Sequence, residues 1–336
     1  MDSPIEKRPT LRSLADITGL GVSTVSQALR NSPEIAEETR RRVQLAAQQA
    51  GYRPNRAGVR LRTGKTNVIT VVLNAQDAGS GFFSDFVYGI ASGIVGTPYH
   101  LVITPYDITD AMAPIRYVIE TASADGVIFS RIQPDDPRVR LLTDNNIPFA
   151  THGRTEMGID HPFHDYDNEA FAYEAVRLLA RKGRKRMALL TPPPSLTYFK
   201  HTYAGFERGL SDFDIEPFPL ATCSTDTPLA EIHDIGRQVA HHPHPPDGII
   251  SSSTSSGLAF ATGLAKEGLR ITKDFDVVSK HSSDLVRMAM PEMISIDEDF
   301  SEAGRNLVEL LIDAIAGKSP NTLQRIVGPK NQPHSP

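Results

Sequence analysis

The stretch of sequence that decides the first part of the fold is residues 10–64, TLRSLADITGLGVSTVSQALRNSPEIAEETRRRVQLAAQQAGYRPNRAGVRLRTG. Apolar residues recur in it at helical spacings, which predicts three short helices with one buried face each. The first helix is expected over 11–18, between Thr10 as N-cap and Gly19 as stop. The predicted buried positions of the three helices are Leu11, Leu14 and Ala15, then Val22, Val25 and Leu29, then Val43, Ala46, Ala47 and Ala50. Three helices with a glycine in the first turn are typical of a helix-turn-helix.

The second helix is expected to turn a polar face to solvent, formed by Ser23, Thr24, Gln27 and Arg30. Hydroxyl and amide groups suit base edges and phosphate oxygens in a major groove; the alternative is that these are merely solvated positions. Charge favours DNA. Residues 1–65 carry 12 Lys and Arg against 6 Asp and Glu, whereas the rest of the chain, from totals of 35 and 40, carries 23 against 34. A basic head on an acidic body indicates a polyanion-binding module joined to a domain with another role.

The segment resembles the headpiece of the lactose/galactose repressor (LacI/GalR) family of bacterial transcription regulators. The matching motifs are, in order, Thr10-Leu11, Thr24-Val25-Ser26, Thr39-Arg40 with Val43, Gly51-Tyr52-Arg53-Pro54-Asn55-Arg56 and Leu61-Arg62-Thr63-Gly64. The resemblance extends over almost the whole chain and weakens only at the last few residues. It implies base reading by Val22, Ser23 and Gln27, where Gln27 departs from the commoner arginine and indicates a different half-site. The predicted DNA-binding residues are Thr10, Leu11, Val22, Ser23, Thr24, Gln27, Arg30, Asn31, Tyr52, Asn55, Arg56 and Leu61.

A short hinge helix is expected over 55–62, because Pro54 suits the start of a helix and donates no backbone hydrogen bond. A helix of two turns is marginal alone, and Gly58 weakens it by about 1 kcal/mol relative to Ala. The resemblance implies that DNA and the partner subunit's hinge stabilise it, with Leu61 wedged between base steps in the minor groove. The alternative is a flexible linker.

After residue 65, short apolar segments alternate with helical patterns in two series, which predicts two lobes, each a doubly wound parallel sheet. The expected strands are 68–73, 100–104, 126–130, 147–152, 187–191, about 217–220, 248–252 and 275–279, and the expected helices are 83–95, about 113–122, 169–181, 197–210, 229–241 and 257–267. The resemblance implies the same architecture, a periplasmic-binding-protein-like effector domain. The predicted domains are a headpiece over 1–54, hinge and linker over 55–65, and an effector-binding and dimerisation domain over 66–332, with an N-lobe of about 66–166 plus 299–322 and a C-lobe of about 167–298 plus 323–332.

Ligands of open parallel sheets bind beyond the carboxyl ends of the strands, so the loops there supply the effector candidates. Against the family pattern, Thr202 replaces an arginine usual in sugar-binding members, Ser253-Thr254 replaces an Asn-Asp pair, and Lys280-His281 replaces an aromatic-Asp pair. Two carboxylates are thereby lost, while Lys200, His201, Lys280 and His281 add positive charge. We therefore hypothesise an anionic effector, a sugar phosphate or sugar acid, since charged donors suit such oxygens; the alternative is that these side chains face solvent or pair with acids.

The predicted effector-binding residues lie at strand ends and in these matched motifs. They are Asn74, Phe82, Phe83, Ser130, Arg131, Arg154, Tyr198, Lys200, His201, Thr202, Ser253, Thr254, Lys280 and His281. Phe82 and Phe83 have an alternative role as core residues, because aromatic pairs that enter a helix are more often packing residues.

Enzyme functions are not supported by the motifs. The chain has no phosphate loop and no Gly-x-Ser-x-Gly elbow, and its histidine-rich segments lack carboxylate or cysteine partners, so neither a cofactor nor a metal is expected. A single cysteine, the absence of an apolar run of 18 residues and the polar N-terminus predict a cytoplasmic protein without a membrane segment.

The expected function is that of a ligand-responsive transcription factor that binds a pseudo-palindromic DNA operator as a homodimer, with a tetramer as the alternative, and most simply represses genes of carbon metabolism. The alternative is a solute-binding or sensor module without a role on DNA, which the basic head argues against.

Overall fold

The protein is described by a computed structural model over residues 9–52, 64–75, 81–220, 223–280 and 284–329. Its chain divides into two units, Met1–Thr66 and Asn67–Pro336.

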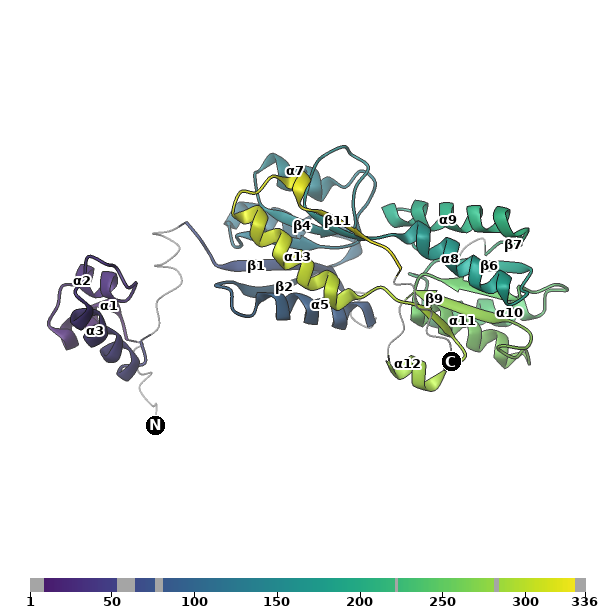
Figure 1. Cartoon of the computed structure of the whole chain (residues 1–336), viewed down its shortest axis with the longest axis horizontal. Coiled ribbons are helices and arrows are strands. Elements are labelled where there is room, and N and C mark those ends of the chain that lie inside the picture. The colour runs from purple at the N-terminus through teal and green to yellow at the C-terminus, as the bar shows by residue number, and fades with distance from the viewer. Residues whose placement is uncertain (1–8, 53–63, 76–80, 221–222, 281–283, 330–336) are drawn as a thin grey trace. The chain divides into compact units, whose positions relative to one another are not determined.

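The first unit is a three-helix headpiece of α1 (Leu11–Thr18), α2 (Val22–Ala28) and α3 (Glu37–Gln49), as the spacing predicts (Figure 1). The Thr10 hydroxyl accepts a hydrogen bond from the Ser13 amide at 3.2 Å and so caps α1, and Gly19 ends that helix with φ 64°. The core consists of Leu14, Ala15, Val25, Ala28, Val43 and Ala47.

Val22 was expected in this core, yet it is 44 % exposed. The reason is helical geometry: the buried face of α2 is centred between Val25 and Ala28, and Val22 lies about a quarter-turn away from that centre. Ala28 takes the buried place instead, and Val22 is left on the outer surface of the helix.

The second unit contains two parallel sheets, with strand orders β11-β5-β4-β3-β1-β2 and β10-β9-β8-β6-β7 (Figure 1). The first sheet with its helices is here named the N-lobe and the second the C-lobe. The strands are β1 (Val68–Asn74), β2 (His100–Tyr106), β3 (Gly126–Phe129), β4 (Phe149–His152), β5 (Phe163–Tyr166), β6 (Arg186–Leu190), β7 (Glu216–Phe218), β8 (Gly248–Ser251), β9 (Asp276–Lys280), β10 (Ile294–Ile296) and β11 (Gln324–Val327).

Helices cover both faces of each sheet, because successive apolar residues of a strand point to opposite faces. In β1, Val71 packs with α5 and α13, whereas Val72 packs with α6 and α7. The C-lobe sheet is covered by α8 and α9 on one face and by α10 and α11 on the other. The helices are α5 (Gly81–Ile94), α6 (Ala113–Thr121), α7 (Pro137–Asp144), α8 (Asn168–Arg181), α9 (Thr197–Phe213), α10 (Leu229–Ala240), α11 (Thr254–Lys266), α12 (Asp284–Ala289) and α13 (Phe300–Ile315).

The lobe boundaries differ from the prediction at the carboxyl end. Residues 323–332 were expected in the C-lobe, but β11 pairs in parallel with β5 and is the edge strand of the N-lobe sheet. The sequence pattern missed it because it is a four-residue strand whose residues are mostly exposed. The short elements β5, β10, α7 and α12 were missed as well, since three to eight residues carry little periodicity.

Close packing of α8 against α9 depends on Gly205, because a Cβ atom there would collide with the Glu169 carbonyl of α8. We expect Gly205→Ala to lower the free energy of unfolding by about 1–3 kcal/mol, since the two helix backbones must separate. Urea denaturation would measure the loss. Gly328→Ala is the matched control, because nothing lies within 4 Å of its Cβ position. Equal stability of the two variants would contradict the packing argument.

Candidate DNA-binding surface and effector pocket

The predicted DNA-reading face of α2 lies on the surface of the headpiece. Val22, Ser23 and Arg30 are exposed, and Thr24 and Gln27 are half-buried. Arg30 is held along the helix by a hydrogen bond from its Nε to the Ser26 carbonyl at 3.0 Å. These side chains form a short, mostly uncharged surface of hydroxyl, amide and methyl groups, which is the chemistry that direct readout in a major groove requires.

The other predicted DNA contacts of the headpiece differ in exposure. Thr10 and Asn31 are exposed, and the Asn31 Oδ1 accepts a hydrogen bond from Gln44 Nε2 at 2.6 Å. Leu11 and Tyr52 pack partly against the headpiece core, so they also support the fold. The hinge predictions for Asn55, Arg56 and Leu61 lie outside the described residues.

A cavity of about 170 Å³ lies between the N-lobe and C-lobe sheets of the second unit. Its wall comes from both lobes and from the segments that join them. The lining residues are Phe82, Ser130, Arg131, Ile132, His152, Gly153, Arg154, Asp165, Asn168, Thr197, Tyr198, Thr225, Asp226, Ser252, Ser253, Lys280, Glu298 and Phe300. Many stand at or just after the carboxyl end of a strand, as in other parallel sheets that bind small molecules.

Lys280, Glu298 and His152 form a buried polar group in the wall. Lys280 Nζ lies 2.6 Å from Glu298 Oε2 and donates to Asn168 Oδ1 at 3.0 Å. His152 Nε2 donates to the other carboxylate oxygen, Oε1, at 2.9 Å. Burial alone would raise the pKa of Glu298, but the charge of Lys280 and the hydrogen bond from His152 outweigh it and lower the pKa to about 2. Glu298 is therefore an ionised acceptor at neutral pH.

The other two cations of the wall also have carboxylate partners. Arg154 Nε lies 3.3 Å from Asp165 Oδ2, and Arg131 forms a two-pronged ion pair with Asp226. Burial raises the pKa of Asp165, and Arg154 opposes that rise. Each lysine and arginine of the described wall thus faces an acid, so the excess positive charge expected from the sequence is balanced.

Seven of the predicted effector residues line this cavity. They are Phe82, Ser130, Arg131, Arg154, Tyr198, Ser253 and Lys280. The placement of Phe82 combines both expected roles, because it lines the cavity and also packs edge-on against Phe300 with ring centroids 4.9 Å apart.

Six other predicted residues do not line it, each for a visible reason. Asn74 is buried at the end of β1, and Phe83 packs against the N-lobe core. Lys200 pairs with Glu156 outside the cavity at 2.5 Å. Thr202 is fully buried and donates to the Tyr198 carbonyl within α9, while its neighbour His201 is half-buried there. Thr254 donates to the Lys280 carbonyl at 3.3 Å. His281 lies outside the described residues.

The sequence analysis missed the residues at the centre of the polar wall, namely His152, Asp165, Asn168 and Glu298. Asp165 lies within the unpredicted strand β5 and Asn168 follows it, while Glu298 follows the unpredicted strand β10. The signal that could have found them is the same rule of polar residues after strands, applied to short apolar segments such as Ile294–Ile296.

His164 lies next to His152 of the polar wall, and its burial leads us to expect a fold that is sensitive to acid. Burial, helped by the neighbouring His152, lowers the pKa of His164 from its ordinary 6.5 to about 4. The unfolded chain therefore takes up a proton near pH 6.5 and the folded chain only near pH 4, so stability falls as the pH drops through this window. We expect His164 to contribute at most about 1.4 kcal/mol per pH unit to the slope of the unfolding free energy against pH, and His164→Gln to remove that contribution.

Urea titrations at several pH values between 4 and 7 would measure that slope. His100→Gln changes an exposed histidine of the same lobe and is the matched control. A slope in His164→Gln equal to that of the parent protein would show that His164 does not carry the effect.

Comparison with known proteins agrees with this architecture. Residues 10–55 match the model of bacterial regulatory proteins of the lacI family, and residues 176–332 match a periplasmic binding protein-like domain. The HTH-type transcriptional regulator AglR of Rhizobium meliloti is 32% identical over 91% of this chain and 87% of its own. The chain belongs to the lacI family of bacterial regulatory proteins. The family resemblance seen in the motifs is thereby confirmed.

Further relatives of this lacI-family protein are regulators too. The HTH-type transcriptional regulator RafR of Escherichia coli is 30% identical over 97% of this chain and 99% of its own. Two solved structures share the fold: a complex of the transcriptional regulator CelR with cellobiose (TM-score 0.71, 23% identity, 98% of this chain and 100% of that chain) and the lac repressor dimer bound to operator and the anti-inducer ONPF (TM-score 0.84, 19% identity, 96% and 97%). The predicted fold class, a helical headpiece with a two-lobed α/β domain, is confirmed. No described helix is both long and apolar enough to cross a bilayer.

Proposed function

We propose that this lacI-family protein is a ligand-responsive, sequence-specific DNA-binding regulator, most simply a repressor of genes for carbohydrate use. The observation that carries the proposal is the combination, in one chain, of a basic helix-turn-helix headpiece with a two-lobed domain that has a small cavity of mixed polar and apolar lining between its lobes. A solute-binding module without a role on DNA would not need the headpiece, and the relatives matched over nearly the whole chain are transcriptional regulators.

The effector is proposed to be a neutral carbohydrate. The wall pairs apolar faces of Phe82 and Phe300 with hydroxyl, carboxylate and amide groups, a combination that suits the two faces of a sugar ring. The CelR neighbour was solved with cellobiose. An anionic effector, as the sequence alone suggested, is less favoured, because Lys280, Arg154 and Arg131 each already face a carboxylate that balances their charge.

The test has two parts. Selection of bound genomic fragments would identify an operator, and a titration across salt concentrations, with and without candidate ligands, would measure specific binding. Thermal shift with cellobiose, other neutral sugars, sugar phosphates and sugar acids would identify the effector class. Absence of any sequence-specific DNA binding would contradict the regulator, and stabilisation by sugar phosphates or acids alone would favour the anion.

A homodimer is proposed because exposed apolar side chains gather on adjoining elements of the N-lobe. Tyr88 of α5 and Val95, directly after that helix, are 69 % and 80 % exposed, and Val102 and Ile103 lie on β2, the edge strand of the sheet. Exposed apolar patches of this kind mark association surfaces. We expect Ile103→Asp to shift the molar mass in sedimentation equilibrium toward the monomer, whereas Ile326→Asp, on the opposite edge strand, leaves it unchanged. A parent protein that is a monomer, or an Ile103→Asp variant with the parent's molar mass, would contradict the proposal that this surface forms the dimer interface. A tetramer would appear as a molar mass of four chains.

A further inference from the structure

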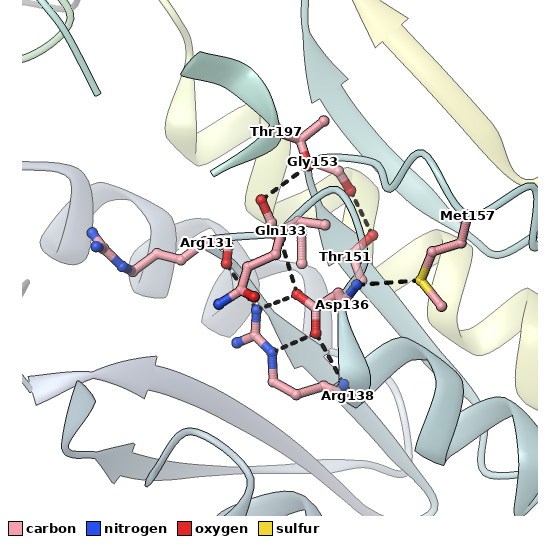
Figure 2. A network of polar contacts seen from close by, with 9 residues as sticks. Arg131, Gln133, Asp136, Arg138, Thr151, Gly153, Met157 and Thr197 are labelled. Atoms are coloured by element: carbon pink, nitrogen blue, oxygen red, sulfur yellow. Dashed lines mark hydrogen bonds and ion pairs between the residues drawn. The ribbon is translucent and has the colours of Figure 1, made fainter. Parts of the chain in front are cut away.

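The loop that follows β3 joins the N-lobe to the C-lobe beside the cavity. Figure 2 shows this loop with its neighbour Thr197. Arg131 donates through Nη1 to Asp226 Oδ1 at 3.1 Å and through Nη2 to Asp226 Oδ2. The carbonyl of Ile132 accepts from both the amide and the hydroxyl of Thr197, at 2.8 and 3.1 Å. Asp226 and Thr197 belong to the C-lobe, so one loop makes a charged and a main-chain contact across the cavity.

The ion pair is well placed to matter energetically. Its side chains are only 12 % and 31 % exposed, so water screens them less than a surface pair. The two parallel hydrogen bonds fix the guanidinium and carboxylate in one plane, which adds geometric specificity. Both residues also line the cavity, so a change in this contact would change the cavity wall.

A second, buried pair shapes the loop itself (Figure 2). The Asp136 carboxylate accepts from the amides of Gln133 and Arg138 at 3.1 and 3.0 Å, and from the Arg138 guanidinium at 3.0 and 2.7 Å. Arg138 Nη2 then donates to the Arg131 carbonyl at 2.8 Å. Arg131 has φ 58°, a conformation that non-glycine residues keep only when their surroundings impose it.

We propose that Arg131 and Asp226 form a clasp that sets the angle between the two lobes over the cavity, and that Asp136 and Arg138 are positioning residues that hold Arg131 in its left-handed conformation. A role of the clasp in transmitting ligand binding to the DNA-binding headpiece rests on the proposed function. A ligand can change the angle between the lobes only by binding one of their arrangements more tightly than the other. The clasp itself can be tested without DNA and without a ligand, so its failure is distinguishable from a failure of the proposed function.

The clasp is tested by interlobe distances in the full chain. Spin labels on Glu120→Cys of the N-lobe and Lys266→Cys of the C-lobe, both exposed positions, would be placed in a Cys223→Ser background. We expect Arg131→Ala to shift or broaden the distance distribution by several ångströms and the charge swap Arg131→Asp with Asp226→Arg to restore it. Arg140→Ala removes a surface pair within the N-lobe and is the matched control. A distribution unchanged by Arg131→Ala, or a swap that fails to restore it, would overturn the clasp.

The positioning pair needs a variant that folds. Removing one charge alone would leave the other buried without a partner, so the variant is the double change Asp136→Asn with Arg138→Gln, and its melting temperature is recorded first. In the folded variant we expect the same altered distance distribution as in Arg131→Ala, although Arg131 and Asp226 are intact. A folded variant with the parent distribution would show that the pair only stabilises the loop and would overturn its positioning role.

Discussion

Lys280→Met is expected to destabilise the second unit by about 3–5 kcal/mol at neutral pH, because it leaves the Glu298 carboxylate buried without its main counter-charge. Glu298 is 2 % exposed and keeps only the hydrogen bond from His152. In the parent protein the lowered pKa of Glu298 contributes stability above its ordinary 4.5 that is lost as the pH falls toward about 2. In the variant burial dominates and raises the pKa of Glu298, so above pH 4.5 the ionised carboxylate lowers the stability of the folded chain.

The loss should therefore depend on pH in a way that a simple packing defect would not. We expect the difference in unfolding free energy between parent and variant to narrow as the pH falls from 7 through 4.5, because Glu298 of the folded variant becomes neutral while that of the parent stays ionised. Urea denaturation across this range measures it. Lys200→Met is the matched control, since its pair with Glu156 is exposed and should contribute less than about 1 kcal/mol. A difference that stays constant with pH would refute the ion-pair explanation.

This ion pair also shows where sequence reasoning stops. The sequence indicated that Lys280 replaces a family residue of the effector site, and the structure does place it in the cavity wall. What the sequence could not supply was its partner, because Glu298 reaches it only after β10 returns the chain to the edge of the C-lobe sheet. Lys200 is a similar case, since Glu156 lies 44 residues earlier and in the other lobe. Charge in a motif is local, whereas charge balance depends on the fold.

Fold features set by local chemistry were the easier ones to predict. The headpiece helices follow from apolar spacing, the Thr10 cap and the Gly19 stop, all within a few residues of one another. The long strand β1 was also easy to predict, because six of its seven residues are buried, as expected for a parallel sheet covered on both faces. The edge strand β11 is the opposite case: it is mostly exposed, and only its pairing with β5 defines it. Its assignment to the wrong lobe follows from that difference.

The second large effect is expected at the DNA surface, where Gln27→Ala should weaken binding to the selected operator about 5- to 150-fold, equivalent to about 1–3 kcal/mol, if the amide reads an adenine edge. Gln27 is half-buried on α2 among the exposed Val22, Ser23 and Arg30, so its truncation leaves the headpiece core of Val25 and Ala28 intact.

Electrophoretic mobility shift at several salt concentrations would separate this loss from a general weakening, because removing an uncharged base contact leaves the salt slope and the affinity for non-specific DNA unchanged. The matched control is Gln48→Ala, which removes the same side chain from an exposed position near the end of α3. Equal losses on specific and non-specific DNA would place Gln27 among the backbone contacts instead. An unchanged operator affinity would remove it from the interface, and the base contacts would then rest with Val22 and Ser23 on the same helix.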